Sequence, residues 1–337
     1  MKAVVLVGGF GTRLRPLTLA VPKQMLPVLD STMLEFVVRE LGRHGVEEVV
    51  LSLGYRPDAF VASYPDDMCE GVHLVYAQEP SPLDTAGAIR FAADHAGITD
   101  RFLAVNGDVL TDIDIAGLWR RHDEFGAEAT IALTPVDDPS RYGVVPIDDR
   151  NRVLEFVEKP PPGTEPSNWI NAGIYVLEPS VLARIDPGRR VSIERETFPR
   201  MAAEGTLYAV HCAEYWIDAG TPESYLQAQL DLMDGRRGTP RDGVSPGAEI
   251  APGALVEHSV IGEGVVVEQG AVIRESLVMA RTRIGRDALL DRALVGEGAV
   301  VGSGSRLSDH AVVGHDEKID SGSMLEHRTV PPPEEWE

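Results

Sequence analysis

Short apolar runs rich in β-branched residues alternate with longer segments of helical periodicity over the first 235 residues. The apolar runs predict strands at residues 3–7, 48–53, 73–77, 102–105 and 130–133. Helices are predicted between them at residues 33–44, 85–95 and 114–125. Alternation of this kind is typical of an α/β domain with a mostly parallel sheet covered on both faces. Such sheets bind ligands at the carboxyl ends of their strands.

The pattern changes after Gly235, where the linker GRRGTPRDG leads into a six-residue repeat. Apolar residues recur in steps of six, with three slips to five, at Val244, Ile250, Val256, Ile261, Val267, Ile273, Met279, Ile284, Leu290, Val295, Val301, Leu307 and Val313. This period predicts a parallel β-helix, in which each short strand contributes one inward apolar side chain. Corners are predicted at Gly262, Gly264, Gly285, Gly296, Gly298, Gly302 and Gly304. Ordinary hairpins are the alternative, but they do not hold a six-residue step over this length.

Two domains are therefore expected, at residues 1–235 and residues 244–320. The second is expected to have roughly four turns, with an exposed end coil and flat faces. Surfaces of this kind suit self-association, so we expect a homo-oligomer formed through the β-helix. The terminal sequence PPPEEWE is predicted to be a solvated tail.

Composition limits the classes of partner. The chain has 53 acidic and 31 basic residues and a net charge of -22, so its global field repels nucleic acid. There is no long apolar run, and the N-terminus leads directly into a strand, so we expect neither membrane insertion nor export. The cysteines, Cys69 and Cys212, have no metal-ligand spacing and predict no disulfide or zinc site. These features fit a protein of the reducing cytoplasm.

A basic, glycine-rich loop, GGFGTRLRPLTLAVPKQMLP, follows the first strand at residues 8–27. It is not the dinucleotide fingerprint, because Leu14 replaces the third glycine, and it is not a P-loop, because no GK[ST] closes it. What remains is a turn whose backbone N–H groups and cations suit phosphate oxygens. A purely structural turn is the alternative. The residues expected to approach a polyanion are Gly8, Gly9, Gly11, Thr12, Arg13 and Lys23, with Arg15 as a less certain member that could pair on the surface.

The motifs GGFGTRLRPLT, PK, NGD, EKP, INAG and WIDAGT occur in this order, and with them the chain resembles the sugar-1-phosphate nucleotidyltransferases. The resemblance covers essentially the whole first domain and implies a Rossmann-like α/β domain followed by a left-handed parallel β-helix. Within the family, SIERETFP and INAGIYVLEPSVL most resemble the mannose-1-phosphate guanylyltransferase branch. Because QEPSP also resembles the thymidylyl branch, glucose 1-phosphate with dTTP, UTP or ATP is kept as the alternative substrate pair.

The reaction that this resemblance implies is attack by a sugar phosphate oxygen on the α-phosphorus of a nucleoside triphosphate, with release of pyrophosphate. The attacking phosphate is already ionised near pH 7, since its second pKa is about 6. No general base is required, and catalysis comes from positioning, cations and metal. The lack of a Ser/His/Asp or Cys/His arrangement is therefore expected.

The resemblance also assigns residues to the nucleotide and the metal. Asp108, after the strand FLAVNGD, and Asp218, in WIDAGT, would hold Mg²⁺. Arg13 would neutralise the α-phosphate and the leaving pyrophosphate, with Lys23 beside it. Gln78, Thr85 and Gly87 would approach the base, where a helix that begins at Thr85 would present free N–H groups.

The sugar phosphate would be bound by the EKP segment. Glu158 would accept hydrogen bonds from sugar hydroxyls, and Lys159 would bind the phosphate. Because neighbouring residues of a strand point to opposite faces, a local bend is needed for both to serve one pocket. Pro160 is compatible with a strand end at this position. An exposed charged pair is the alternative. The sugar would further be lined by Gly143, Asn171 and Gly173.

Two positions depart from the family pattern. Gln24 follows Lys23 where a proline is usual, and Asp84 stands where a glycine is usual. The Asp84 carboxylate could read the N–H donors of guanine, but a cap on the helix at Thr85 is the favoured interpretation.

Two other classes of function are considered. A non-catalytic subunit that senses nucleotide sugar would be expected to have lost Arg13, Lys23, Asp108 or Asp218, all of which are present. A β-helix acyltransferase would need a catalytic histidine on a coil. His258 and His310 are available, but each is expected in a polar corner as a solvated side chain.

Overall fold

The computed structural model describes residues 1–336 and contains two compact units. The first comprises Met1–Gly9 and Leu34–Trp216, and the second comprises Phe10–Met33 and the chain from Ile217 onward. Each unit has a hydrophobic core of its own. The glycine-rich loop is divided between them, because Gly8 and Gly9 follow the first strand whereas Gly11 to Lys23 belong to the second unit. Of the helices in the described residues, none is long and apolar enough to cross a membrane.

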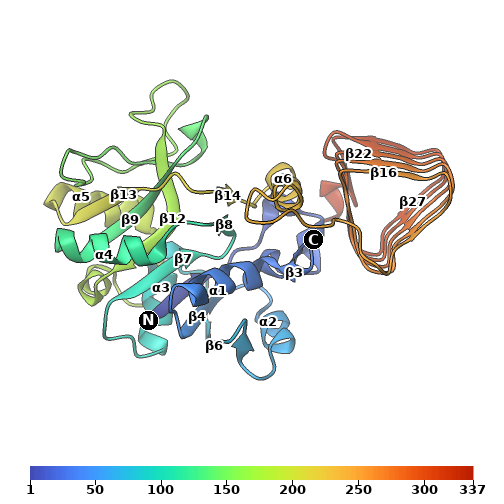
Figure 1. Ribbon diagram of the computed structural model, residues 1–337. Helices are drawn as coiled ribbons and strands as arrows, with labels where there is room; N and C mark the ends of the chain where they lie inside the picture. Colours follow the sequence, from blue (N-terminus) through green and yellow to red (C-terminus); the bar gives the residue numbers. More distant parts are fainter. Residues whose placement is uncertain (337) are drawn as a thin grey trace. The chain divides into compact units, whose positions relative to one another are not determined.

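A mixed sheet forms the centre of the first unit (Figure 1). Its central strands β7, β1, β4 and β6 are parallel neighbours, whereas β12 pairs antiparallel with β7 and β9. The strands of this sheet are β1 (Lys2–Leu6), β4 (Glu48–Leu53), β5 (Met68–Cys69), β6 (Val72–Gln78), β7 (Phe102–Asn106), β9 (Ala129–Pro135), β10 (Gly143–Val144), β11 (Val157–Glu158), β12 (Trp169–Leu177) and β13 (Leu207–His211). The five strands predicted from the apolar runs are all present, and the expected Rossmann-like α/β fold is confirmed.

The carboxyl ends of the parallel strands share one edge of this sheet. Leu6 of β1 lies opposite Ser52 of β4 and Asn106 of β7, and Leu53 of β4 lies opposite Gln78 of β6. The segments that leave these strands therefore begin side by side. Four predicted site residues of this unit, Gly8, Gly9, Gln78 and Asp108, lie at these strand ends or just after them.

Helices cover both faces of the sheet. Ala3, Val4 and Val5 are consecutive residues of β1, so they alternate between its faces, and all three are completely buried. Helix α3 packs against β1, β4 and β6 through small residues, which allow a close approach. The helices of the chain are α1 (Met33–Arg43), α2 (Pro57–Ser63), α3 (Asp84–His95), α4 (Ile115–Phe125), α5 (Phe198–Glu204) and α6 (Pro222–Met233). The chain before α6 also contains the short strands β8 (Val109–Thr111) and β14 (Trp216–Asp218).

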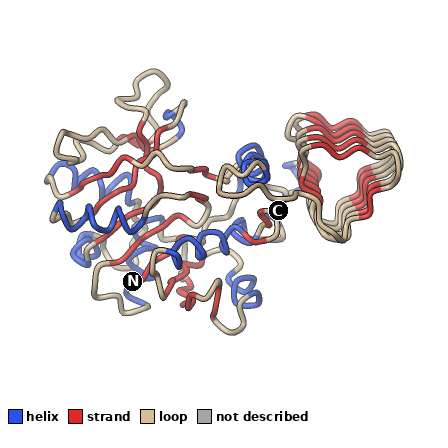
Figure 2. The backbone as a smooth tube through the Cα atoms, viewed as in Figure 1, coloured by secondary structure: helices blue, strands red, loops and turns tan. Residues whose placement is uncertain are grey.

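The second unit contains a stack of parallel coils. Figure 2 shows its strands on three faces, and within residues 1–336 each face is a parallel sheet of five strands. These sheets are β15, β18, β21, β24 and β27 (from Glu249–Ile250 to Lys318–Ile319), β16, β19, β22, β25 and β28 (from Leu255–Glu257 to Met324–Glu326), and β17, β20, β23, β26 and β29 (from Val260–Ile261 to Thr329–Val330). The arrangement is consistent with the expected left-handed parallel β-helix.

The register of the coils corrects two details of the sequence prediction. Ile261, Val278, Val295 and Val313 lie above one another, so Val278 is the inward residue of β20 (Leu277–Val278) and Met279 is not. The described residues also form five coils instead of about four, because the last repeat continues through Ile319, Leu325 and Val330. At the open first coil, Ile250 is 39% exposed, since no coil covers it.

Side chains of helix α6 form hydrogen bonds with a hairpin made by β2 (Pro27–Val28) and β3 (Ser31–Thr32). The amide of Gln229 is completely buried, donates to the Pro27 carbonyl at 2.7 Å and accepts from the Leu29 N–H at 2.8 Å. The Tyr225 hydroxyl donates to the same Pro27 carbonyl. The chain that follows Lys23 is thus held by buried hydrogen bonds, whose loss would leave backbone groups unsatisfied.

The corner glycines of the coils, among them the predicted Gly302 and the unpredicted Gly322, serve two different purposes, which can be separated by substitution. A Cβ at Gly302 would lie 2.4 Å from the Ser321 nitrogen of the next coil, whereas a Cβ at Gly322 would meet nothing within 4 Å although its φ is +75°. We expect Gly302→Ala to destabilise the protein by about 2–3 kcal/mol through overpacking. Gly322→Ala should cost about 1 kcal/mol through backbone conformation alone. Denaturant unfolding followed by far-UV circular dichroism measures both, and equal costs would contradict the assignment.

Candidate active site

The predicted site residues fall in both units, and each group is built by its own local structure. The first unit contains Gly8, Gly9, Gln78, Thr85, Gly87, Asp108, Gly143, Glu158, Lys159, Asn171 and Gly173. The second contains Gly11, Thr12, Arg13, Lys23 and Asp218.

In the second unit, residues Phe10–Leu26 form a tightly folded segment, which we call the signature loop. Gly11 has a left-handed φ of +61° and begins the short 3-10 helix Thr12–Leu14, which carries Arg13. The Gly11 carbonyl accepts from the Leu14 N–H at 2.9 Å and from the Thr18 hydroxyl at 2.8 Å. Glycine is required there, because a Cβ would lie 3.0 Å from the Thr18 side chain in addition to the backbone strain.

Arg13 meets a predicted metal ligand. Its Nη2 lies 3.4 Å from Asp218 Oδ2, and its side chain is 57% exposed, so the guanidinium stays accessible to an anion. The contact depends on Gly220 of the WIDAGT motif. A Cβ at Gly220 would lie 2.5 Å from Arg13 Nη2 and 2.6 Å from Asp218 Oδ1. The motif is recognisable in the sequence, but the role of Gly220 is not, because it depends on a contact with Arg13, which is distant in sequence.

The remaining polar residues of the signature loop are more buried than expected. Lys23 is only 8% exposed, and Gln24, which replaces the usual proline, is 3% exposed. Within residues 1–336, neither Gln24 Oε1 nor Arg15 Nε has a hydrogen-bond partner although both atoms are buried. The surface pairing considered for Arg15 is therefore not observed through its Nε.

In the first unit, the glycines after β1 differ in environment. A Cβ at Gly8 would lie 3.0 Å from the Gly54 nitrogen and 3.0 Å from Glu79 Oε1, so close packing explains this glycine. A Cβ at Gly9 would meet nothing within 4 Å, and Gly9 is exposed. Of the two glycines, Gly9 is therefore the one with open space around it, which the predicted approach of a polyanion requires.

The NGD motif lies at the end of β7, against the end of β1. The Gly107 N–H donates to the Leu6 carbonyl at 3.0 Å, and a Cβ at Gly107 would lie 2.7 Å from Val7 Cγ1. This packing fixes the backbone from which Asp108 projects. On its other side Asn106 packs against Gly173 of the INAG motif, where a Cβ would lie 2.6 Å from Asn106 Nδ2.

A bend separates Glu158 from Lys159, as the sequence required. Strand β11 ends at Glu158, and Lys159 adopts a left-handed φ of +50°, which is uncommon for a residue with a side chain. As a result Lys159 Nζ lies 3.8 Å from Glu158 Oε1 instead of on the opposite face. Strain of this kind is frequent at functional sites. Burial, and next the charge of Glu194, raise the pKa of the Glu158 carboxyl.

The INAG motif forms a bulge in β12, between Asn171 and Tyr175. Asn171 Nδ2 donates to the Tyr175 hydroxyl at 2.8 Å, and Asn171 Oδ1 accepts from the Gly173 N–H at 2.9 Å. Gly173 has a φ of +76°, which the bulge requires. At the neighbouring strand, a Cβ at Gly143 would lie 3.0 Å from Glu158 Oε2. The structure thus brings Gly143 to Glu158 and Lys159 and orders Asn171 and Gly173 in one bulge.

The expectation of free N–H groups at the start of α3 is wrong. The N–H groups of Ala86 and Gly87 donate to the Val191 carbonyl at 2.9 and 3.2 Å, and the Thr85 N–H donates to Asp84 Oδ1 at 2.9 Å. Residues 189–194 therefore occupy the helix end that was predicted to face the base. Asp84 has a φ of +60°, begins the helix as its first residue and lies 3.6 Å from Arg190, so its carboxylate is engaged in local structure.

Glu194 is the carboxylate that sequence reasoning missed. Its Oε2 accepts from the Thr85 hydroxyl at 2.7 Å and from the Ser192 hydroxyl at 2.8 Å. It lies in a π-helical turn, Ile193–Thr197, an irregularity that is common at functional sites. Since its charge also acts on Glu158, Glu194 links the residue predicted near the base to the residue predicted for the sugar. The only sequence signal was the SIERETFP segment, in which Glu194 is one of three acidic or basic side chains in a row.

The donor set suits a hard cation that is completed by substrate. In the part of the chain that the structure describes, no group of three or more His, Cys, Asp or Glu side chains could hold a metal ion alone. Asp108 and Asp218 offer carboxylate oxygens, and magnesium is commonly bound by one or two carboxylates together with substrate phosphates. Each carboxylate is thus, by its chemistry, a donor that suits magnesium bound together with nucleotide phosphates.

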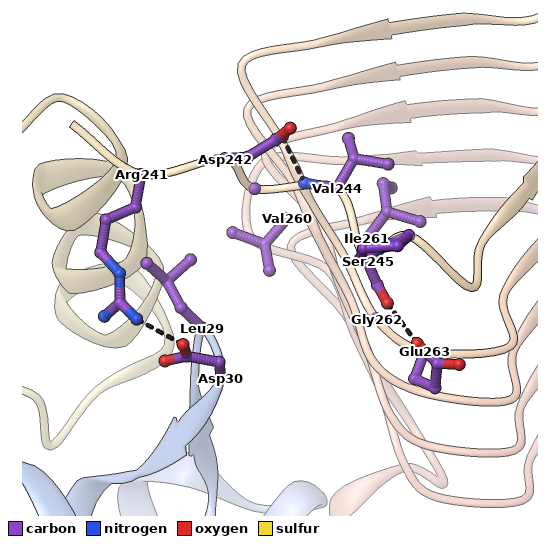
Figure 3. Close-up of a pocket in the computed structure, with 12 residues that line it drawn as sticks. Leu29, Asp30, Arg241, Asp242, Val244, Ser245, Val260, Ile261, Gly262 and Glu263 are labelled. Atoms are coloured by element: carbon purple, nitrogen blue, oxygen red, sulfur yellow. Dashed lines mark hydrogen bonds and ion pairs between the residues drawn. The ribbon is translucent and has the colours of Figure 1, made fainter.

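A cavity of about 630 Å³ lies elsewhere in the second unit, beside the first coil (Figure 3). None of the predicted site residues lines it. The charged groups that line the cavity form hydrogen bonds or ion pairs with one another or with neighbouring lining residues. Arg241 pairs with Asp30, Glu263 accepts from the Ser245 hydroxyl, and Asp242 accepts from the Val244 N–H at 2.9 Å. The cavity is therefore distinct from the predicted phosphate-binding groups.

Comparisons with known proteins match two successive parts of the sequence. The nucleotidyl transferase family matches residues 2–235, and the GMPPB C-terminal domain matches residues 240–335. The chain is 41% identical over 265 residues to a mannose-1-phosphate guanylyltransferase of Mycobacterium tuberculosis, which covers 74% of this chain and 72% of that protein. It is 42% identical over 229 residues to the mannose-1-phosphate guanylyltransferase catalytic subunit beta of Dictyostelium discoideum, covering 67% and 63% of the two chains. Among solved structures, HddC from Yersinia pseudotuberculosis matches with a TM-score of 0.60 and 29% identity, over 68% of this chain and 99% of that one.

The coupling between Glu194 and Glu158 predicts a change in titration. Replacing Glu194 by glutamine removes a negative charge that disfavours ionisation of Glu158, so the pKa of Glu158 should fall. Carboxyl ¹³C NMR titration of the folded protein measures the shift. Glu196→Gln is the matched control, because Glu196 pairs with Arg189. A Glu158 pKa that moves equally in both variants would contradict the coupling.

Proposed function

Because the chain belongs to the nucleotidyl transferase family and is a nucleotidyltransferase, we propose that it transfers GMP from GTP to mannose 1-phosphate, giving GDP-mannose and pyrophosphate. The observation that supports this substrate pair is the 41–42% identity to relatives named for that reaction. The local structures around Arg13 and Glu158 support the chemistry, because one exposes a guanidinium and the other sets a lysine beside a half-buried carboxylate.

In the proposed reaction an oxygen of the sugar phosphate attacks the α-phosphorus of GTP. A new P–O bond forms, the bond from the α-phosphorus to the β-phosphate oxygen breaks, and pyrophosphate leaves with the electron pair. The nucleophile is ionised near neutral pH, so no protein base takes part. Arg13 and Lys23 offset the charge on the triphosphate and the leaving group, which is where a preorganised cation contributes most.

The acceptor is proposed to bind in the first unit. Lys159 would contact the phosphate, and the carboxylate of Glu158 would accept hydrogen bonds from hydroxyls of mannose. Gly143, Asn171 and Gly173 would border the ring. Gln78, which is exposed at the end of β6, together with Thr85 and Gly87, would lie toward the base, with Gly8, Gly9, Gly11 and Thr12 around the phosphates.

We further propose Mg²⁺ as the cofactor, held by Asp108 and Asp218. When bound, the ion would withdraw charge from the phosphates and so lower the cost of bringing two anions together. What the chain itself contributes is orientation. Gly107 fixes the backbone before Asp108, and the Arg13 guanidinium faces Asp218.

The acyltransferase alternative finds no support in the environment of its histidines. His258 Nε2 lies 2.8 Å from Asp234 and His310 Nδ1 lies 3.6 Å from Asp309, and both residues occupy left-handed corners of the coil. The His258 side chain is 39% exposed, as expected for a solvated corner residue, whereas that of His310 is only 20% exposed.

The substrate pair is tested by a panel of five triphosphates with mannose 1-phosphate and glucose 1-phosphate. GTP with mannose 1-phosphate should give the highest kcat/KM for pyrophosphate release in the presence of Mg²⁺. A best rate with dTTP and glucose 1-phosphate would replace the proposed function by the thymidylyl alternative.

Asp108→Asn should lower the kcat/KM for GTP and mannose 1-phosphate by about two orders of magnitude, since it removes a charged ligand to the metal.

Gly220→Ala tests whether the contact between Arg13 and Asp218 matters for catalysis. The added methyl group would enter the space of both side-chain ends, which can rotate away at little cost in stability. We expect kcat/KM to fall about 10- to 100-fold, because small misplacements of catalytic groups are costly. The midpoint of thermal unfolding should stay nearly unchanged, and an unchanged kcat/KM would show that the contact is dispensable.

Two further properties are proposed. The apolar first coil, with Ile250 39% and Leu255 40% exposed, supports self-association of the chain through the β-helix, which sedimentation velocity measures.

The two cysteines are free and buried, and burial raises the pKa of each thiol to about 12. This agrees with the cytoplasm as the proposed compartment.

A further inference from the structure

A histidine of the β-helix contacts the signature loop, although almost 300 residues separate them in sequence. His315 Nε2 lies 3.0 Å from the Leu17 carbonyl oxygen. The preceding residue, Gly314, packs against Pro16, where a Cβ at position 314 would lie 3.3 Å from Pro16 Cβ. Two consecutive residues of one coil thus contact two consecutive residues of the loop.

The partners of His315 define its protonation. The Leu17 carbonyl can only accept, so Nε2 must carry the proton. On the other side of the ring Nδ1 lies 3.0 Å from the Glu297 backbone nitrogen, which can only donate, so Nδ1 must be unprotonated. The imidazole is therefore neutral, and it bridges the coil below it to the loop.

Inside the signature loop a short series of hydrogen bonds leads from Leu17 toward Arg13. Leu17 and Thr18 belong to the 3-10 helix Leu17–Leu19, and the Thr18 hydroxyl donates to the Gly11 carbonyl at 2.8 Å. Gly11 begins the 3-10 helix that carries Arg13, and its carbonyl also accepts from the Leu14 N–H. The backbone held by His315 is thus linked, through the hydrogen bond from Thr18 to Gly11, to the start of the helix that carries Arg13.

We propose that His315 is a positioning residue for nucleotidyl transfer, because it fixes Leu17 and through it the part of the signature loop that presents Arg13. This role rests on the proposed function, in which Arg13 contacts the triphosphate. It gives the β-helix a part in catalysis that is separate from self-association. His315 itself does not contact substrate.

Burial lowers the pKa of His315, whereas the hydrogen bond to the Leu17 carbonyl and two neighbouring negative charges act in the opposite direction. Glu297 from the preceding coil and Asp316 next to the ring favour the protonated form, and Glu297 also pairs with Arg281 at 2.6 Å. Glu317 packs by its Cγ against Gly314, and Arg15 lies in the loop close to Leu17 in sequence. Burial is the largest effect, and the pKa of His315 lies below 6.5.

Two substitutions separate the two hydrogen bonds. His315→Asn retains an acceptor near the position of Nδ1 but is too short to reach Leu17, whereas His315→Gln extends a donor toward Leu17. His310→Asn is the matched control on the same coil. We expect His315→Asn to raise the KM for GTP about fivefold to tenfold, the effect of one lost hydrogen bond, with the KM for mannose 1-phosphate nearly unchanged. His315→Gln should restore most of the wild-type KM.

Hydrogen exchange provides a measurement that does not depend on which substrates are used. Amides of residues 11–19 should exchange faster in His315→Asn than in wild type, His315→Gln or His310→Asn. If wild type lacks activity with GTP while this loop still loses protection, the proposed substrate fails and the positioning contact stands. If the loop keeps its protection and the KM for GTP is unchanged in His315→Asn, the inference is overturned.

The pH dependence has a defined sign. Since the pKa of His315 is lower in the folded chain than its ordinary value of 6.5, the stabilising contribution of the neutral ring is complete above pH 6.5 and is lost as pH falls below it. Selective ¹⁵N-histidine NMR should show the Nε2–H tautomer of His315 persisting below pH 6.5. An imidazolium at pH 6.5, or the opposite tautomer, would contradict the bridge.

Discussion

Repulsion between anions is the constraint on which this molecule depends. The protein carries a net charge of -22, and both proposed substrates are phosphates. Binding therefore relies on a few cations whose field is local, since charges more than about 8 Å away are screened at physiological salt. Arg13, Lys23 and Lys159 are the cations that we propose for this role, and each has an unusual backbone conformation or an unusual degree of burial. Arg13 follows a left-handed glycine, Lys23 is buried, and Lys159 is itself left-handed.

Carboxylates recur beside these cations, and this pairing has a physical reason. A lone guanidinium on a short helix would sample many positions, whereas Arg13 is drawn to Asp218 in the space left by Gly220. Glu158 plays a similar part for Lys159, and Glu194 adds a second negative charge to that region. Cation and carboxylate together can hold phosphate on one side and metal or hydroxyl groups on the other. The acidic excess of the chain is thus compatible with phosphate chemistry.

Much of this arrangement could be predicted from sequence because it is local. Strands β1 and β7 are continuous apolar runs, and the residues that follow them, Gly8 and Asp108, are at the carboxyl edge by topology alone. The bend after Glu158 followed from strand geometry. Inward positions of the β-helix followed from the repeat, apart from β20, where Val278 and Met279 are both apolar and the period cannot choose between them.

What sequence could not supply came from contacts between distant segments. The start of α3 was expected to be open because nothing nearby in sequence covers it, yet Val191 accepts its N–H groups. Glu194 and Gly220 owe their importance to partners far along the chain, Thr85 and Arg13. Strand β12 was not predicted because Asn171 and Gly173 interrupt its apolar pattern at the bulge.

The number of stacked coils also sets the distance between helix α6 and His315. Successive strands of a parallel β-helix rise by about 4.8 Å, so every coil between α6 and His315 contributes one such step to the position of that ring. In a related protein that has gained or lost one of those coils, the imidazole would be displaced by more than the length of a hydrogen bond, and its contact with the Leu17 carbonyl would be lost. Strands that follow His315 carry no such restriction. Variation in repeat number among related chains should therefore accumulate at the far end of the solenoid, while the number of coils that precede Gly314 stays constant.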